Sequence, residues 1–412
     1  MRSQKIRLKP TKEQESLMWW YSKVSRNFWN LLVDIDKRNN QGEFDEILSE
    51  NGNKSYYSKF YNRMIYSLNS SDYRNLAKIV VAENYEKDRQ FWSWYYQPNQ
   101  SFIYGLLAKE LVKIRKRNKG KLNFRNIDKT EPSFNVRCDV FPGKTRPSRI
   151  YLKDNGKLQV PTLGDMRYGS VREGFDLSCK KQVANISFDG KYWYLSYTED
   201  VETQVGVLPD ATDGVGIDLG IKTLATISDG TTVPNIKTFR RVRILTKRLK
   251  RLQRKLSRKY RINKCNKHHK TKNILKLEQQ IKLIYRSIKN IRINHIRKFV
   301  SELVKKQPRY IAIEDLNVKG MMKNRHLAKD VANCSFYTIK EHLILKATER
   351  GIPVRLVDRF YPSSRLCSSC GSYKPDLKLS QRVYHCCNCG VRIDRDFNAS
   401  LNIANTNEYV LV

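Results

Sequence analysis

Two pairs of cysteines near the end of the chain have the spacing of a metal site. Cys367 and Cys370 form one C-x2-C pair, and 15 residues separate it from a second pair, Cys386 and Cys389. Two tight turns of this kind offer four thiolates to one tetrahedral zinc ion and leave no coordination position open for a reactant. The spacing therefore predicts one structural Zn²⁺ ion rather than four unrelated cysteines. Cys387 is a competing neighbour of Cys386, but the paired spacing favours Cys386.

Three acidic residues stand where strands or helices are expected to begin or end. Asp218 lies within the apolar strand GIDLG, where a buried carboxylate is costly unless it is paired or binds a metal, so ion coordination is favoured. Glu314 ends the expected strand RYIAIEDL. Alternation of side chains puts Asp315 on the opposite face, so Glu314 and Asp315 cannot both point into one site. Asp396 lies near the start of a helix predicted from DRDFNASLNIAN, where helix capping and metal binding are both open.

Carboxylates that converge in a strongly basic chain have one good chemical use, which is to hold Mg²⁺ against phosphate. Two such ions about 4 Å apart would activate a water and stabilise the leaving 3′ oxygen of a phosphodiester. Binding of nucleic acid alone would not require these acids. The three residues therefore predict a nuclease site, provided that the fold brings them together.

The net charge points to a polyanionic partner. The chain has 412 residues, with 79 Lys and Arg against 40 Asp and Glu, which gives a formal charge of +39. Such an excess favours nucleic acid, because each phosphate contact releases counterions. No apolar run approaches twenty residues and no signal-peptide pattern is present, so we expect a cytoplasmic protein without membrane contact. Nine cysteines, four of them in the paired motif, fit a reducing compartment.

The first half of the chain divides into a helical and a strand-rich part. An alternating segment at residues 3–9 predicts a strand. Thr11 then caps a helix, and further helical patterns cover residues 63–68, 75–96 and 102–116. From residue 133 to 198 the period changes to two, with turn residues between short segments, which predicts a small antiparallel barrel or sandwich that the first strand could join. A polar linker follows at residues 203–212.

The second half predicts an α/β domain with a mixed sheet. Two apolar strands follow residue 214, and further strands at residues 309–316 and 353–358 alternate with helices, one of them at residues 336–350. Residues 239–306 contain 25 Lys and Arg and two acids. Two heptad-like apolar stripes in this segment predict an antiparallel helical hairpin whose outer face binds phosphates. A merely solvated hairpin would be better served by interspersed charges of both signs.

The motifs together resemble the TnpB family encoded by insertion sequences. The resemblance is carried by GIDLG at 216–220, IAIEDLNVKGM at 311–321, VDRFYPSS at 357–364, the paired C-x2-C motif, DRDFNASLNIA at 394–404 and the opening QKIRLKPTKEQ. It implies a RuvC nuclease domain of RNase H fold, with Asp218, Glu314 and Asp396 as its carboxylate triad and the four cysteines as an inserted zinc ribbon. The choice of Asp396 over Asp394 leans on this resemblance.

The resemblance also implies a multidomain α+β organisation. Residues 1–10 and 129–205 would form a wedge β-barrel, and residues 11–128 a helical recognition domain. The nuclease domain would cover residues 206–412, with the basic hairpin at 239–306 and the zinc ribbon at 363–393.

The function that the resemblance implies is RNA-guided cleavage of double-stranded DNA beside a short adjacent motif. Its partners would be a transposon-derived guide RNA and the target duplex, with two Mg²⁺ ions, one Zn²⁺ ion and one copy of the protein in a ribonucleoprotein of the prokaryotic cytoplasm. A compact type V CRISPR effector shares every motif. A transposase is less favoured, because nothing resembles a helix-turn-helix. A nuclease-silent RNA-guided repressor should have lost triad acids, whereas all three are present.

Overall fold

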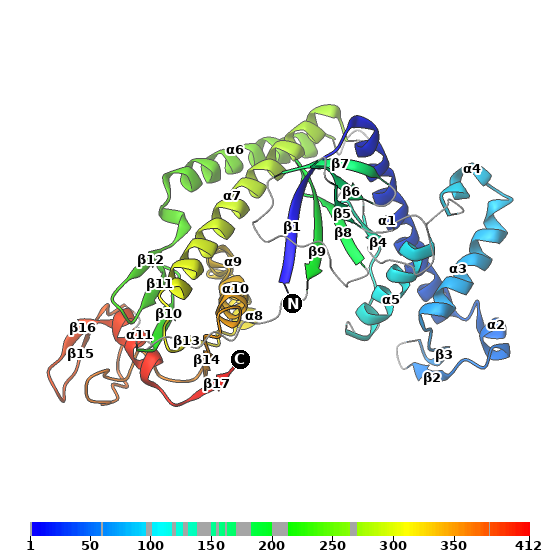
Figure 1. The fold of residues 1–412 in the computed structure, drawn as a ribbon. Coiled ribbons are helices and arrows are strands. Elements are labelled where there is room, and N and C mark those ends of the chain that lie inside the picture. Colours follow the sequence, from blue (N-terminus) through cyan, green and yellow to red (C-terminus); the bar gives the residue numbers. More distant parts are fainter. Residues whose placement is uncertain are drawn as a thin grey trace. The chain divides into compact units, whose positions relative to one another are not determined.

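The computed structural model describes residues 2–58, 61–95, 101–117, 121–126, 131–137, 150–153, 156–160, 163–169, 183–199, 213–263, 270–378 and 380–412. The chain forms two compact units, Met1–Val201 and Glu202–Val412 (Figure 1). The domain boundaries expected at residues 128/129 and 205/206, and the linker at 203–212, lie outside the described residues.

The first unit begins with a strand and a long helix. Strand β1 (Arg2–Lys9) is followed by α1 (Lys12–Gln41), whose predicted N-cap is confirmed. Thr11 Oγ1 accepts a hydrogen bond from the Gln14 N–H at 3.2 Å, and Gln14 Oε1 accepts one from the Thr11 N–H at 3.0 Å. This reciprocal capping satisfies two backbone donors at the helix start. Helix α1 shares an apolar core with α3 (Ser70–Tyr85) and α5 (Ser101–Arg117).

The prediction of helix at residues 63–68 is wrong. Strand β3 (Arg63–Tyr66) occupies this segment and pairs antiparallel with β2 (Ser55–Ser58). Of its four residues only Ile65 is buried, so the segment has no helical apolar face, and the partner strand satisfies its backbone groups. The helical pattern at residues 75–96 is also interrupted, because α3 ends at Tyr85 and a short α4 (Arg89–Trp92) and a 3-10 turn (Ser93–Tyr95) follow. Helix α2 (Asp45–Glu50) lies between α1 and β2.

The strand-rich part of the first unit is one antiparallel sheet of seven strands. The order is β4-β8-β9-β1-β7-β6-β5, so β1 joins the sheet between two later strands, as the sequence suggested. The later strands are β4 (Ser133–Arg137), β5 (Tyr151–Leu152), β6 (Leu158–Val160), β7 (Gly164–Tyr168), β8 (Val183–Phe188) and β9 (Trp193–Glu199). Ile6 and Leu8 of β1 are buried in its core together with Trp193. Alternation along β1 therefore turns Lys5 and Arg7 to the other face.

The second unit contains the predicted mixed α/β sheet. Its six strands have the order β12-β11-β10-β13-β14-β17, in which the two pairings of β13 are parallel and the others antiparallel. The strands are β10 (Val215–Leu219), β11 (Thr223–Ile227), β12 (Thr232–Pro234), β13 (Ile311–Glu314), β14 (Val354–Val357) and β17 (Tyr409–Leu411).

Helices cover both faces of this sheet. Helices α7 (Lys272–Lys305) and α10 (Phe336–Thr348) pack on one face against Ile217, Ile313 and Val354. Helix α11 (Arg395–Asn405) lies on the opposite face (Figure 1), where Ile403 meets Ala312 and Val357. Short elements complete the unit: a 3-10 turn (Ile236–Thr238), α8 (Val318–Met321), α9 (Ala328–Cys334), β15 (Val383–His385) and β16 (Arg392–Asp394).

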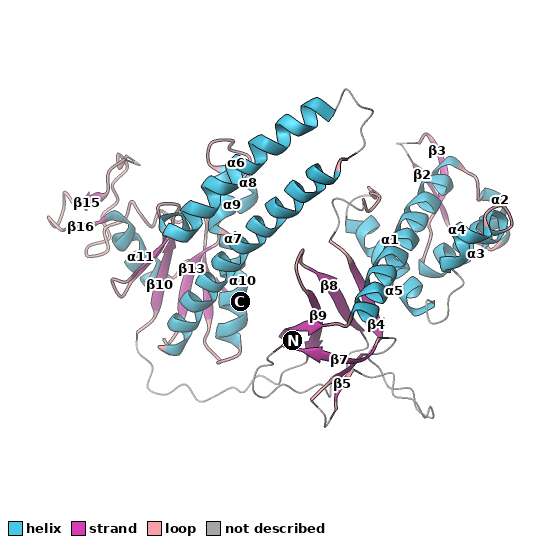
Figure 2. Cartoon of the chain, turned by 90° about the horizontal axis from the view of Figure 1, so that it is seen from above, coloured by secondary structure: helices cyan, strands magenta, loops and turns pink. Residues whose placement is uncertain are grey.

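The basic segment at residues 239–306 forms the predicted helical hairpin. Helix α6 (Arg240–Asn263) lies along α7 in Figure 2. The predicted stripes meet, since Leu249 packs with Ile281 and Ile284. Gln253 contacts Tyr285 and Tyr260 contacts Glu278, a register that establishes the antiparallel direction. Among the described helices of the chain, none is both long enough and apolar enough to cross a membrane.

Candidate metal centres

The pairing of β10 with β13 makes Asp218 and Glu314 neighbours. The two strands are parallel, and Ile217 lies opposite Ile313. Asp218 and Glu314 follow these residues at the carboxyl ends of the two strands. Because Ile217 and Ile313 face the core formed with α7 and α10, alternation turns both carboxylates to the side covered by α11. Two acids that are 96 positions apart in the sequence thus share one edge and one face of the sheet.

Gly216 allows α11 to approach this face closely. A Cβ atom at residue 216 would lie 2.1 Å from the carbonyl oxygen of Ser400 and 2.5 Å from the backbone nitrogen of Ala404. Both are backbone atoms of the helix, which cannot swing aside as a flexible side chain can. The absence of a side chain at residue 216 therefore sets the distance between α11 and β10. Asp396, in the first turn of α11, is held close to Asp218 in this way.

Replacement of Gly216 by Ala should displace α11 from the sheet. We expect a loss of about 3 kcal/mol in the free energy of unfolding, at the upper end of the range for overpacked cores. Urea denaturation would measure it. Gly105→Ala is the matched control, since Gly105 lies inside α5 and the nearest atom to its added Cβ is the side-chain Arg74 Nη1, 3.8 Å away. That variant should gain roughly 0.5–1 kcal/mol from helix propensity. A wild-type urea midpoint for Gly216→Ala would contradict the close approach.

The start of α11 separates the roles of its two aspartates. Asp394 is the N-cap, because its Oδ1 accepts hydrogen bonds from the backbone N–H groups of Asp396 at 2.9 Å and Phe397 at 3.0 Å. Capping is therefore not the role of Asp396. Its carboxylate instead lies 3.1 Å from Arg395 Nη2 and 3.6 Å from Arg382 Nη1. Nothing in the residue types near Asp396 identified these two arginines as its partners.

Burial raises the pKa of both strand carboxylates, and neighbouring negative charge adds to this effect at Asp218. The pKa of Asp218 is raised to about 8, first by burial and then by the nearby charges of Glu314 and Asp396. Burial also raises the pKa of Glu314, against a hydrogen bond that Ser363 Oγ donates to its Oε1 at 2.6 Å. Carboxylates that disfavour each other's ionisation are stabilised by a cation placed between them. The donor set and its electrostatics therefore fit a hard divalent cation.

The three carboxylates do not form as tight a group as the four cysteines. Within the described part of the chain, the four cysteines are the only group of three or more metal-binding side chains whose ligand atoms all lie within 4.8 Å of one another. Asp315 is outside the cluster, as alternation predicted. It contacts Lys340 at 2.6 Å and Arg359 at 3.2 Å instead.

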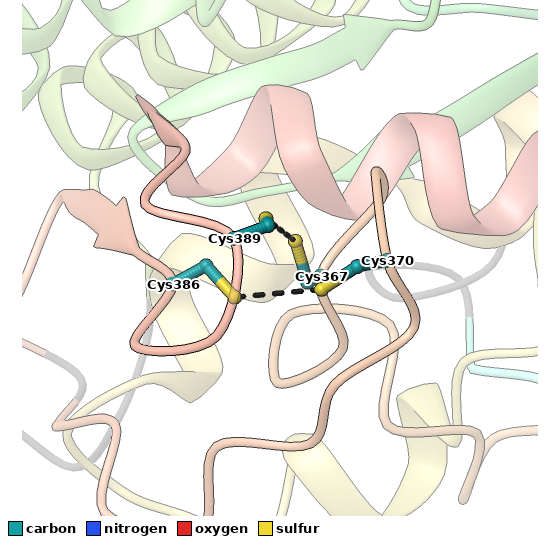
Figure 3. Close-up of side chains that lie close together, drawn as sticks. All are labelled: Cys367, Cys370, Cys386 and Cys389. Atoms are coloured by element: carbon teal, nitrogen blue, oxygen red, sulfur yellow. Dashed lines mark hydrogen bonds between the residues drawn. The ribbon is translucent and has the colours of Figure 1, made fainter.

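The four predicted cysteines converge on one point. Figure 3 shows Cys386 and Cys389 on one loop facing Cys367 and Cys370 on another. The sulfur atoms of Cys367 and Cys389 are 3.6 Å apart, as are those of Cys370 and Cys386. A tetrahedral ion with Zn–S bonds near 2.3 Å requires sulfurs about 3.8 Å apart. The thiols therefore fit a zinc ion, whereas Cys387 is exposed and lies outside the group.

Two buried asparagines connect the cysteine loops to α11. Asn398 Nδ2 donates to the Leu366 carbonyl at 2.7 Å, and its Oδ1 accepts from the Ser368 N–H at 2.9 Å. Asn402, one turn later, donates to the carbonyl of Ser363 at 2.7 Å and to that of Leu366 at 2.8 Å. The segment that carries Cys367 is thereby held against the helix that carries Asp396. Ser363 of the same segment donates a hydrogen bond to Glu314. The cysteine group and the carboxylates are therefore connected through this segment.

Two family models match segments of this chain. Residues 197–325 match the OrfB family of IS605 elements, described as a probable transposase. Residues 336–403 match the model described as the Cas12f1-like TNB domain. The first segment contains Asp218 and Glu314, and the second contains Asp396 and all four clustered cysteines.

Curated relatives agree with these matches. The chain is 31% identical over 274 residues to an Escherichia coli (strain K12) protein named as a candidate RNA-guided DNA endonuclease, InsQ, and the match covers 63% of this chain. It is 31% identical over 221 residues, 52% of its length, to the CRISPR-associated endodeoxyribonuclease Cas12f1 of Sulfoacidibacillus thermotolerans. It is 27% identical over 224 residues, 51% of its length, to the TnpB-like protein L79 of Acanthamoeba polyphaga mimivirus.

The matches cover only part of each relative, namely 64% of InsQ, 50% of the Cas12f1 protein and 42% of L79. The segments that the two family models match carry the strands, the helix and the cysteine loops that form both candidate centres. By these matches the chain is similar, over part of its length, to RNA-guided DNA endonucleases and TnpB-like proteins, and to Cas12f1.

Proposed function

We propose that this chain is an RNA-guided DNA endonuclease encoded by an insertion sequence. It would cleave double-stranded DNA next to a short adjacent motif by metal-dependent hydrolysis of a phosphodiester. The names of the InsQ and Cas12f1 relatives support this activity. The observation that carries the proposal is that Asp218 and Glu314 lie side by side at the carboxyl ends of β10 and β13, with Asp396 nearby in the first turn of α11.

In this proposal the three acids form the catalytic site and hold two Mg²⁺ ions. Bound Mg²⁺ would neutralise charge at the scissile phosphate and favour attack by water. Asp218 and Glu314 fit this role because the β10–β13 register fixes them side by side. Asp396 fits it because Asp394 carries out the capping. Ser363 would orient Glu314, and Arg382 and Arg395 would limit the repulsion around Asp396 while the metal is absent.

The four clustered cysteines would hold one structural Zn²⁺ ion. The second unit would then be a RuvC-like nuclease domain of RNase H fold, at residues 206–412, with a zinc ribbon at 363–393. Residues 1–10 and 129–205 would form the wedge β-barrel, and residues 11–128 the recognition domain. The mixed sheet with α11 on one face supports the assignment of the nuclease domain. The entry of β1 into the seven-stranded sheet supports the assignment of residues 1–10 and 129–205 to one wedge domain.

The partners would be a transposon-derived guide RNA and a double-stranded DNA target. The formal charge of +39 exceeds what one duplex footprint of about 6–10 phosphates requires. The composition of α6 is the most direct support for a long polyanionic partner, since 12 of its 24 residues are Lys or Arg and none is acidic. A guide–target heteroduplex would be held through backbone contacts and A-form shape, with sequence read by base pairing. One protein copy per particle, in the cytoplasm, is part of the same proposal.

The test is a cleavage assay that varies only the RNA. Protein loaded with a guide whose spacer has been replaced should cut at the new complementary site, and protein freed of RNA should show no specific cleavage. Sequencing the RNA that copurifies with the protein would identify the natural guide. A cut site that stays in place when the spacer changes would indicate a DNA-reading endonuclease instead.

A compact CRISPR effector is the second candidate, because residues 336–403 match the Cas12f1-like domain. The copurified RNA separates the two, since CRISPR repeats would flank its spacer in that case. A nuclease-silent repressor would bind the guided target and leave both strands intact in Mg²⁺.

A further inference from the structure

A cleft of about 380 Å³ opens beside the carboxylate cluster. Its walls include Leu219 at the end of β10, Glu314 at the end of β13, and Arg359 two residues beyond the end of β14. Ligands of open α/β sheets bind beyond the carboxyl ends of the strands. The cleft therefore lies where a substrate would enter, and it shares Glu314 with the proposed catalytic site. Its volume falls within the range of about 300–1,000 Å³ that suits one small ligand.

The charge of the cleft wall favours an anion. Asp315 contacts both Lys340 Nζ and Arg359 Nη2, so one carboxylate positions two cations. Lys319 adds a third cation to the wall. Apart from Glu314, the wall thus carries three positive charges and one negative charge. Ammonium and guanidinium groups have several donors each, so contact with Asp315 leaves others available for a phosphate.

An aromatic side chain in the same wall favours a nucleobase. Tyr337, in the first turn of α10, lines the cleft and is 64% exposed. Its neighbours Phe336 and Ile339 are buried in the sheet core, so the helix turns Tyr337 outward while its other face is anchored. Aromatic rings beside cations bind single-stranded nucleic acid by stacking on a base while the cations hold the backbone.

We propose that this cleft binds one nucleotide of the substrate strand, next to the phosphate at Asp218 and Glu314. Tyr337 stacks on the base of that nucleotide, and Arg359 and Lys340 hold its phosphate. The proposal rests on the nuclease function proposed above. It implies that the strand is unpaired at this position, because a base stacked on Tyr337 cannot remain in a duplex. Tyr337, Lys340 and Arg359 are then positioning residues that align the strand for cleavage.

The test combines Tyr337→Ala with a set of substrates that each lack one base. In single-turnover cleavage, Tyr337→Ala should be roughly 5- to 150-fold slower than wild type, the range expected for the loss of one base stack. For the wild-type protein, an abasic site at one position near the cut should slow cleavage similarly. Tyr337→Ala should lose nothing further on that substrate, because both changes remove the same contact. Tyr337→Phe should retain the wild-type rate, and so should Tyr373→Ala, which removes an exposed tyrosine of the cysteine-loop segment.

A second measurement does not require cleavage. A short DNA strand with 2-aminopurine at the same position, bound in Ca²⁺ in place of Mg²⁺, should show fluorescence quenching that Tyr337→Ala abolishes and Arg359→Gln weakens. Wild-type cleavage by Tyr337→Ala with an unchanged abasic profile would overturn the cleft proposal while the nuclease proposal stands. Quenching by Tyr337 in a protein that cuts no DNA would support the cleft and overturn the nuclease proposal.

Discussion

Asp218→Asn is expected to abolish DNA cleavage and to leave binding of guide RNA and target DNA nearly unchanged. The substitution keeps the shape of the side chain but removes the charge that would hold the cation, while the contacts to nucleic-acid phosphates remain. We expect the single-turnover rate to fall at least about 1,000-fold, which corresponds to roughly 4 kcal/mol of activation free energy. Cleavage assays in Mg²⁺ and gel-shift titrations of the guided target would measure the two effects.

Asp315→Asn is the matched control, because Asp315 is a carboxylate next in sequence to Glu314 that lies on the other face of the strand. It should retain metal-dependent cleavage, reduced by at most the effect expected of the cleft residues. An equal loss of binding and cleavage in Asp218→Asn would show that Asp218 supports the fold instead of the chemistry.

Asp218→Asn should also make the metal-free protein more stable than the wild type toward the alkaline end of the range from pH 5 to pH 8. Asp218 has a pKa of about 8 in the folded protein against 3.8 for an ordinary aspartate. The folded state therefore binds more protons than the unfolded state between these values, and stability falls as the pH rises from about 4 to 8. The Asp218→Asn variant has no such loss, because an amide does not titrate in this range. In EDTA, the difference in melting temperature between variant and wild type should grow from pH 5 to pH 8, by roughly 2–4 °C for each kcal/mol.

Purified protein should contain one tightly bound zinc ion per chain, and Cys370→Ser or Cys389→Ser should lose it. Binding of a structural zinc ion contributes folding free energy, on the order of 10 kcal/mol in small zinc domains. Loss of the zinc ion should make the 363–393 segment less ordered, because no metal would then hold the two cysteine loops together. Elemental analysis and limited proteolysis of this segment would measure both effects.

The loss of zinc should also reach the carboxylate centre. Asn398 and Asn402 hold the loop around Cys367 to α11, and Ser363 in the same segment donates to Glu314. Cleavage by the zinc-free variants should therefore fall as well, although no cysteine belongs to the carboxylate cluster. Cys387→Ser is the matched control and should keep both zinc and activity, since Cys387 is exposed outside the cysteine group. Loss of zinc from Cys387→Ser but not from Cys386→Ser would reverse the ligand assignment.

The sequence by itself determined the features that depend on near neighbours in the chain. The C-x2-C spacing predicted the cysteine group because each pair closes within one turn. Thr11 predicted the start of α1 because an N-cap bonds residues only three positions away. The apolar stripes predicted the α6/α7 hairpin because helical periodicity is local. The helix prediction for residues 63–68 was wrong because so short a segment has no reliable hydrophobic period. Pairing with β2 determined the conformation of this segment.

Only the tertiary structure decided which distant residues meet. Alternation along the strand separated Glu314 from Asp315, but the parallel register of β10 and β13 was needed to place Glu314 beside Asp218. GIDLG shows a glycine at residue 216, and nothing local to it shows that α11 packs there. The structure also decided where α11 begins. Asp394 is its N-cap, so Asp396 does not cap the helix, whereas a helix that began one or two residues later would reverse this assignment. The sequence alone also did not identify the roles proposed for Ser363, Arg382 and Tyr337. The type of a residue limits which interactions its side chain can make, but the packing of segments distant in the sequence determines which residues it contacts.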